Sequence, residues 1–171
     1  MQDREPAAYR TLTNTRLRRH DPWLCHIKHI LKVTAMPCPR FEPVAPVSDP
    51  QHTNARLPLI DEYDGICHAG PEAIDAPAAH RFRSCNHGYS AGACQHFPAG
   101  ETRSSFRYSV VSQEGDTLTV VGIEEQNYTP VRWHNIEYSV ATGQIQTPLQ
   151  DPSLRAQALA FCQSYLRRFP L

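Results

Sequence analysis

Hydrophobic and polar residues alternate most regularly in the second half of the chain. The alternation runs through residues 106–110, 117–125 and 136–140, and a further short stretch, 144–147, follows Thr142-Gly143. A period of two is typical of strands that bury one face, and glycine-containing turns separate the stretches. The pattern therefore predicts an antiparallel meander of three to four strands.

A helical period follows the predicted meander. Asp151-Pro152 has the residue types preferred at a helix N-cap and at the first helical position, and apolar residues recur after it every three or four positions. The stripe consists of Leu154, Ala158, Phe161, Cys162, Tyr165 and Leu166. We expect this helix to cover one face of the sheet. Cys162 is interpreted as a small buried hydrophobic residue within the stripe.

The first half of the chain shows neither period clearly. Six prolines lie between Met36 and Pro58, and because proline donates no backbone hydrogen bond we expect an extended strap without ladder pairing. Asp61 to Gly65 is interpreted as a solvated acidic turn, with binding of a hard cation as the alternative. The fold class is therefore α+β: a small antiparallel meander with a C-terminal helix packed on it, preceded by an irregular proline- and cysteine-rich metal-binding half.

Residues 1–35 differ in charge from the rest of the chain. They hold seven basic and three acidic residues, against ten and fourteen in residues 36–171. We expect a basic, partly disordered N-terminal extension with a short helix over 22–34, and then a single metal-binding domain over 36–171. Cys25 and His29 would form an i, i+4 pair on that helix, and a place on the helix rim is favoured over metal binding.

Four cysteines fall in turn-rich sequence and carry the main functional prediction. Cys38, Cys67, Cys85 and Cys94 are spaced Cys-x28-Cys-x17-Cys-x8-Cys. Four thiolates can hold a tetrahedral zinc ion or a [4Fe-4S] cluster. Structural zinc sites are usually built from closely spaced cysteine pairs, and the wide spacing here therefore favours the cluster.

Other interpretations of these residues stay open. His68, His87 and His96 each lie within two residues of a proposed cysteine ligand, so a zinc site that includes histidine is the alternative. Cys85 and Cys94 could instead form a local disulfide, or one of them could be a nucleophile with His87 or His96 as its base. Outside this group, His134 is interpreted as an ordinary core or surface histidine.

Composition narrows the functional classes. The chain has no apolar run of about 18 residues, and its first residues lack the apolar stretch of a secretory signal, so we expect a cytoplasmic protein without a membrane span. Seventeen basic and seventeen acidic residues cancel, which gives the chain little electrostatic reason to bind nucleic acid. In a reducing compartment, cysteines more often bind metals or pack as apolar groups than form disulfides.

Three short segments resemble a family of uncharacterised bacterial proteins that are small and contain cysteines. The segments are Met36–Phe41 (MPCPRF), Gly65–Ala69 (GICHA), and Cys85–Tyr89 (CNHGY) with Cys94. The resemblance would cover residues 36–171 and agrees with a domain that starts at Met36. It implies no activity beyond the grouping of the four cysteines.

The favoured hypothesis is a small cytoplasmic metalloprotein whose four cysteines hold a [4Fe-4S] cluster. The cluster would serve electron transfer, or act as a structural or redox-sensing element, together with a protein partner. A zinc-stabilised protein-interaction module is the alternative, and an enzyme with a cysteine nucleophile is the third option.

Overall fold

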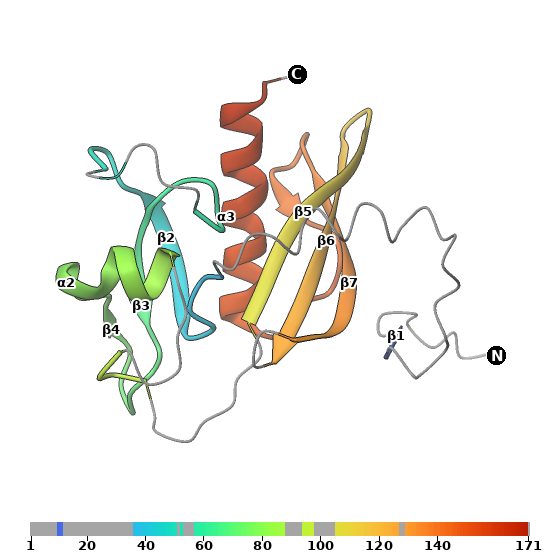
Figure 1. The fold of residues 1–171 in the computed structure, drawn as a ribbon. Coiled ribbons are helices and arrows are strands. Elements are labelled where there is room, and N and C mark those ends of the chain that lie inside the picture. Colours follow the sequence, from blue (N-terminus) through green and yellow to red (C-terminus); the bar gives the residue numbers. More distant parts are fainter. Residues whose placement is uncertain are drawn as a thin grey trace.

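The computed structural model describes residues 36–50, 52, 57–87, 94–97, 105–126 and 129–170, and the backbone of residues 10–11. Two antiparallel sheets lie on either side of a long helix (Figure 1). The elements are β1 (Arg10–Thr11), β2 (Phe41–Pro46), β3 (Tyr63–Cys67), β4 (Ile74–Asp75), α2 (Ala78–His80), η1 (Arg81–His87), β5 (Ser105–Glu114), β6 (Thr117–Gln126), β7 (Thr129–Ser139), β8 (Gln144–Ile145) and α3 (Pro152–Arg168). The predicted α+β class is confirmed.

The larger sheet contains the predicted meander. Strands β5, β6 and β7 pair antiparallel in sequence order, and β8 returns to pair with β7. Gly115 and Gly143 have φ values of 54° and 67°, in the left-handed region that glycine adopts readily, and they lie in the turns before β6 and β8. Leu118 and Val120 of β6 are fully buried on one face. The alternation in the sequence therefore predicted the meander and its turns, although β5 and β7 are longer than the predicted stretches 106–110 and 136–140.

Helix α3 begins where its capping residues predict. The Asp151 carboxylate accepts a hydrogen bond from the Leu154 amide at 3.1 Å, which satisfies one of the free amides of the first turn. Phe161 stacks on Tyr108 of β5 with ring centroids 5.4 Å apart, and Cys162 is fully buried in the core, as expected for a small apolar side chain. The helix contacts β2 as well as the meander, and Figure 1 shows it between the two sheets.

A second sheet occupies part of the proline-rich stretch. Strands β2, β3 and β4 pair antiparallel in that order. The prediction that prolines exclude pairing here is therefore wrong for β2. The physical reason is that β2 is an edge strand of this sheet, and the register of β2 shifts between Pro43 and Ala45. At an edge or a bulge, a proline can be accommodated without the loss of a ladder hydrogen bond.

The predicted acidic turn is also more regular than expected. Its last three residues belong to β3, and its carboxylates form ion pairs with arginines. Asp61 pairs with Arg167 and Arg168 of α3, and Asp64 pairs with Arg81 of η1. These carboxylates thus connect elements of the fold, which weighs against the hard-cation alternative.

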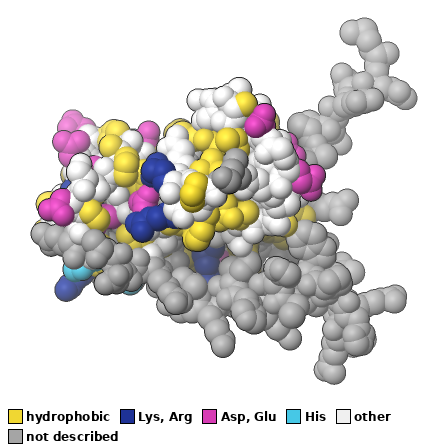
Figure 2. All heavy atoms as spheres, turned by 90° about the horizontal axis from the view of Figure 1, so that it is seen from above, with side chains coloured by type: hydrophobic (Ala, Val, Ile, Leu, Met, Phe, Trp, Pro, Cys, Tyr) yellow, Lys and Arg dark blue, Asp and Glu magenta, His cyan; other side chains and the backbone are white. Residues whose placement is uncertain are grey.

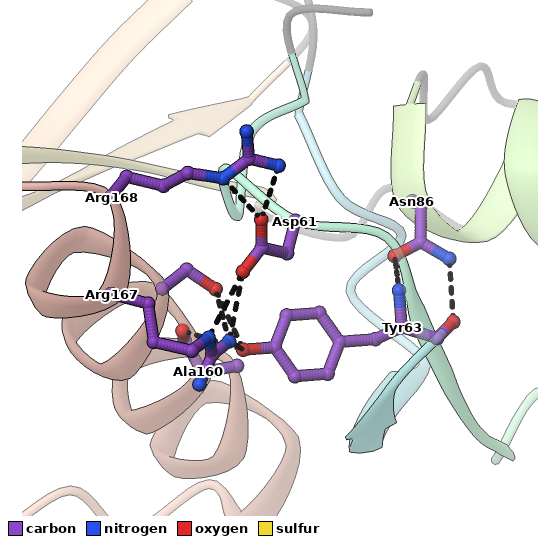
Figure 3. A network of polar contacts seen from close by, with 7 residues as sticks. Asp61, Tyr63, Asn86, Ala160, Arg167 and Arg168 are labelled. Atoms are coloured by element: carbon purple, nitrogen blue, oxygen red, sulfur yellow. Dashed lines mark hydrogen bonds and ion pairs between the residues drawn. The ribbon is translucent and has the colours of Figure 1, made fainter. Parts of the chain in front are cut away.

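Polar contacts hold the C-terminal end of α3 against β3 (Figure 3). Arg167 donates to the Asp61 carboxylate at 2.9 Å and to the Tyr63 hydroxyl at 2.8 Å. That hydroxyl also contacts the Ser164 hydroxyl at 2.7 Å, while Arg168 donates to Asp61 at 2.9 Å. Asp61, Tyr63, Ser164, Arg167 and Arg168 are called the α3–β3 network below. Burial alone would raise the pKa of Asp61, but the hydrogen bonds from Arg168 and Arg167 hold it below its usual value of 3.8.

The end of the molecule near the C-terminus has a mixed surface. Viewed from above in Figure 2, hydrophobic side chains gather in the middle of this face, and acidic side chains lie at its two sides. Phe169, just beyond α3, is 58% exposed, and its ring lies 5.1 Å from that of Tyr165. Within the described part of the chain, no helix is long and apolar enough to cross a membrane.

Most of the predicted N-terminal extension lies outside the described residues, as do the predicted helix over 22–34 and the Cys25–His29 pair. Arg10–Thr11 form β1, which pairs antiparallel with β7 opposite Trp133 and Arg132. The expectation of a partly disordered extension stays a prediction, because the remaining residues of 1–35 lie outside the described part of the chain.

Replacing Gly65 by alanine is expected to destabilise the small sheet by about 1–3 kcal/mol. A Cβ atom there would overlap the Glu42 carbonyl oxygen and lie 2.7 Å from the Phe41 ring, so the pairing of β2 with β3 must shift. Urea unfolding would measure the loss. Gly70→Ala is the matched control, since the nearest atom to its added methyl lies 3.7 Å away, and equal stability of the two variants would contradict the prediction.

Replacing Asp61 by asparagine should destabilise the protein by about 2 kcal/mol at pH 7, because it removes a charge that two arginines hydrogen-bond. The depressed pKa means that this stabilisation is present above pH 3.8 and is lost as pH falls through the lower value of the folded state. The difference from wild type should therefore shrink below about pH 4. Asp64→Asn, at the exposed pair with Arg81, should change stability by less than about 1 kcal/mol. A wild-type difference that stays constant with pH would refute the assignment.

Candidate metal centre

Cys38 lies in a buried turn that leads into β2. Its amide donates to the Cys85 carbonyl at 2.9 Å, and its own carbonyl accepts from the Phe41 amide at 3.0 Å. Pro37 and Pro39 on either side are buried, which restricts the backbone around the thiol. The side chain of Gln157 on α3 donates to the carbonyls of Cys38 and Phe41 at 2.9 Å and 2.8 Å. Helix α3 therefore fixes the turn that carries Cys38.

Cys67 is the last residue of β3, directly opposite Phe41 in the register of the small sheet. The pairing continues past it, because the His68 amide donates to the Arg40 carbonyl at 2.8 Å. Cys67 and Cys38 are thus placed at the same end of the β2–β3 pair, on the two segments that meet there. The β2–β3 pairing thus brings together two segments that lie far apart in the sequence.

Cys85 lies in the π-helix η1, where the sequence led us to expect a loop. The wider π-helical turn is held against β3 by Asn86, which is fully buried. The Asn86 side chain accepts from the Tyr63 amide at 2.9 Å and donates to the Tyr63 carbonyl at 2.9 Å, so it continues the strand's hydrogen bonding like an additional backbone unit. Asn86 also donates to the Arg81 carbonyl at 3.1 Å. π-Helical turns occur frequently at functional sites.

Cys94 lies in a short turn, 94–97, in which its carbonyl accepts from the Phe97 amide at 3.0 Å. Phe97 is buried in the core cluster, and Cys94 packs against that cluster while staying partly exposed. The neighbouring residues Gly88, Tyr89, Gly92 and Pro98 lie outside the described residues.

Backbone contacts bring the segments of Cys38, Cys67 and Cys85 together. Burial raises the pKa of Cys85 to about 12, and the neighbouring thiols of Cys38, Cys67 and Cys94 add to the rise. Burial likewise raises the pKa of Cys38 to about 12, with contributions from Cys67 and Cys94. All five cysteines of the described residues are free thiols, so the alternative of a Cys85–Cys94 disulfide is not what the structure contains.

The donor set suits a soft metal centre. Cys38 and Cys85 belong to the core cluster with Phe41 and Phe97, and Cys94 packs against it; an isolated thiolate would be poorly solvated there, and a bound metal would neutralise it. In the described residues, no three His, Cys, Asp or Glu side chains are arranged to hold a single metal ion. Among the described residues, the four thiols are therefore not arranged around a single metal position.

The three histidines proposed as alternative ligands have other contacts. His68 Nε2 lies 2.7 Å from the Glu42 carboxylate. His87 is exposed and stacks on Phe82 with ring centroids 5.5 Å apart. His96 Nε2 lies 3.4 Å from the Gln95 amide nitrogen. Each imidazole ring thus contacts a neighbouring side chain, and the sequence pattern did not predict these contacts.

A second group of polar side chains is buried on the meander, apart from the cysteines in sequence. His134 on β7 is buried with its Nε2 3.5 Å from the Glu124 carboxylate, which confirms a core histidine. Burial lowers its pKa, although Glu124 acts in the opposite direction. Arg107 and Glu125 form a buried ion pair on neighbouring strands. We assign these residues to the packing of the sheet.

Sequence reasoning missed Gln157 and Asn86. Both are fully buried amides that bond backbone groups of sequence-distant segments. Gln157 carried one available signal, since it is a polar residue between apolar positions of the α3 stripe. Asn86 carried none, because asparagine is common in loops.

No protein-family model, curated protein or solved structure matches this chain.

Replacing Gln157 by methionine, which keeps the volume of the side chain and removes both donors, should destabilise the protein by about 2–3 kcal/mol because two buried carbonyls lose their partner. Gln163→Met on the same helix, at a half-buried position, is the control and should change stability by less than about 1 kcal/mol. Thermal and urea unfolding would measure the stability of both variants. If the two substitutions destabilised the protein equally, the structural role assigned to Gln157 would be wrong.

Proposed function

We propose that this chain is a small iron–sulfur protein in which Cys38, Cys67, Cys85 and Cys94 bind one [4Fe-4S] cluster. The observation that supports the proposal is the backbone pairing of the segments that carry three of the thiols: the Cys38 amide donates to the Cys85 carbonyl at 2.9 Å, and Cys67 lies opposite Phe41, three residues after Cys38. A shared ligand would explain why segments separated along the sequence bring three buried thiols into one region.

The spacing of the ligands favours a cluster over a zinc ion. Zn–S bonds of about 2.3 Å bring four thiolates within about 3.8 Å of one another in a tetrahedral site. A [4Fe-4S] cluster binds one thiolate at each of four iron corners, so its ligands stay further apart and need no paired knuckle. Four single cysteines on four different segments suit the second arrangement.

The surroundings support a redox or structural role for the cluster. Apolar neighbours such as Phe41 and Phe97 would limit solvent access, and solvent exposure is one of the factors that set the potential of such clusters. The cluster would join the small sheet to η1 and would exchange electrons with a protein partner or respond to oxidants. A cytoplasmic, reducing location belongs to the same proposal.

A zinc-stabilised interaction module is the second candidate. The contact between His68 and Glu42 resembles the carboxylate–histidine pairs that orient metal-binding imidazoles, which supports a site with three cysteines and one histidine. The third option is an enzyme with Cys85 or Cys94 as nucleophile. Cys85 is disfavoured in this role because burial raises the pKa of its thiol to about 12, whereas a nucleophile needs a lowered pKa.

Anaerobic purification or reconstitution should give a brown protein with about four irons and four sulfides per chain. Cys85→Ala should lose most of this iron. Cys162→Ala is the matched control, because Cys162 is a buried core thiol; it should keep the iron and lose only about 1 kcal/mol of stability. Iron, sulfide and zinc analysis with visible absorption would measure the result.

A colourless protein that contains stoichiometric zinc and unfolds when a chelator is added would contradict the cluster hypothesis and support the zinc-stabilised module. If Cys85→Ala and Cys162→Ala lost the same share of the iron, the assignment of Cys85 as a cluster ligand would be wrong.

A further inference from the structure

A cavity of about 160 Å³ lies where the loop after β2, the turn before β3 and the C-terminal end of α3 meet. Its volume is close to that of a protein cavity of about 150 Å³ that holds one benzene molecule. None of its described lining residues is a cysteine, so the cavity is separate from the candidate metal centre. Its apolar wall consists of Pro46, Val47, Pro50, Leu57 and Ile60.

Backbone hydrogen bonds hold two walls of the cavity. The Val47 amide donates to the Glu62 carbonyl at 2.8 Å, and the Asp61 amide donates to the Leu59 carbonyl at 2.9 Å. The second bond closes a γ-turn around Ile60, whose φ is 71°. A β-branched residue rarely adopts a positive φ, and such strained residues are frequent at ligand-binding sites. The cavity is therefore formed by the backbone as well as by side chains.

One charged group at the cavity has a net positive charge. Asp61 and Arg168 line the cavity, and Asp61 pairs with both Arg167 and Arg168 (Figure 3). Two guanidinium groups thus share one carboxylate. Arg168 reaches Asp61 through Nε at 2.9 Å and Nη2 at 2.8 Å, so its Nη1 is not part of this pair. Arg168 can therefore donate to an anionic group in the cavity.

A second charged group at the cavity has a net negative charge. Glu62 lines the cavity, and its side chain is 5% exposed. Arg81 Nε lies 3.4 Å from Glu62 Oε1, while the same guanidinium also pairs closely with Asp64. Two carboxylates thus share one guanidinium. A buried carboxylate with one long contact of this kind can accept further hydrogen bonds from a cationic group in the cavity.

We propose that this cavity binds a free α-amino acid with a short apolar side chain, such as valine. The Glu62 carboxylate accepts hydrogen bonds from the ammonium group of the ligand, and Arg168 donates to its carboxylate. The side chain of the ligand packs against the apolar wall. A zwitterion fits because it offers one charged group to each of the two oppositely charged sides, whereas an amine or a carboxylic acid offers only one. This inference does not depend on the proposed cluster.

Three related probes test the proposal on the wild-type full-length chain at pH 7. L-Valine carries both charges, valinamide only the ammonium group, and N-acetylvaline only the carboxylate. Titration of ¹⁵N-labelled protein, followed by amide chemical shifts, should show saturable binding of valine at Val47, Leu57 and Ile60. Valine should bind at least about tenfold more tightly than either other probe, because each of them lacks one charge-assisted contact. The two single-charge probes also represent the first and last residues of a peptide, so they distinguish a free amino acid from a chain end.

Two matched pairs of variants test the assigned residues. Arg168→Gln should weaken valine binding at least about tenfold, whereas Arg167→Gln, which loses a bond to the same Asp61 carboxylate but does not line the cavity, should change the affinity less than about twofold. Glu62→Gln should likewise weaken binding at least about tenfold. Asp64→Asn is its control, because Asp64 pairs with the same Arg81 from outside the cavity lining. Circular dichroism checks that each variant is folded.

Three results would overturn the inference. The first is wild-type protein that shows no saturable change with valine, which would mean that the cavity holds only water. The second is binding of valinamide or N-acetylvaline as tight as that of valine. The third is an equal loss of affinity in the folded members of either matched pair. If Arg168→Gln or Glu62→Gln does not fold, the comparison of the three probes on the wild-type protein decides.

Discussion

The two hydrogen bonds from the Gln157 amide to the carbonyls of Cys38 and Phe41 connect the two halves of this protein. They join residues 119 and 116 positions apart, and they lie in the core, where an unpaired carbonyl would cost about 1–3 kcal/mol. Through them the orientation of α3 on the meander also fixes the turn that carries Cys38. The small sheet and the thiols on it are placed relative to the larger sheet by this polar contact and by the α3–β3 network at the other end of the helix.

The sequence predicted the parts of the fold that depend on local periodicity. The meander and α3 have one apolar face each, with turn and cap residues at their ends. Most of their bounds were predicted within a few residues, but β7 begins at Thr129, well before the predicted stretch 136–140. β2 was missed because proline argues against pairing unless the strand is known to lie at an edge, and edge position depends on neighbours that are distant in sequence. η1 was missed because its stability depends on Asn86 bonding to β3, a contact that no local pattern records.

The candidate site, like the fold, could be predicted only in part from the sequence. The choice of Cys38, Cys67, Cys85 and Cys94, and the exclusion of Cys162, followed from residue type and from the helical stripe that contains Cys162. Their approach to one another could not be derived from spacing, since it depends on the pairing of Phe41 with Cys67 and on the bond from the Cys38 amide to the Cys85 carbonyl. The difference in exposure between Cys94 and the other three is likewise a property of the packed chain.

The location of the thiols determines what a bound cluster would do to stability. All four precede the meander in sequence, and they lie where the small sheet, η1 and the Cys94 turn meet. Leu118, Val120, Ile136 and Phe161 of the meander and α3 belong to the same core cluster as Cys38 and Phe41. Burial of a thiol is unfavourable when it must ionise and favourable when a bound metal neutralises it. A bound metal would therefore act directly on the segments that carry the thiols, and it would reach the meander and α3 only through this shared core.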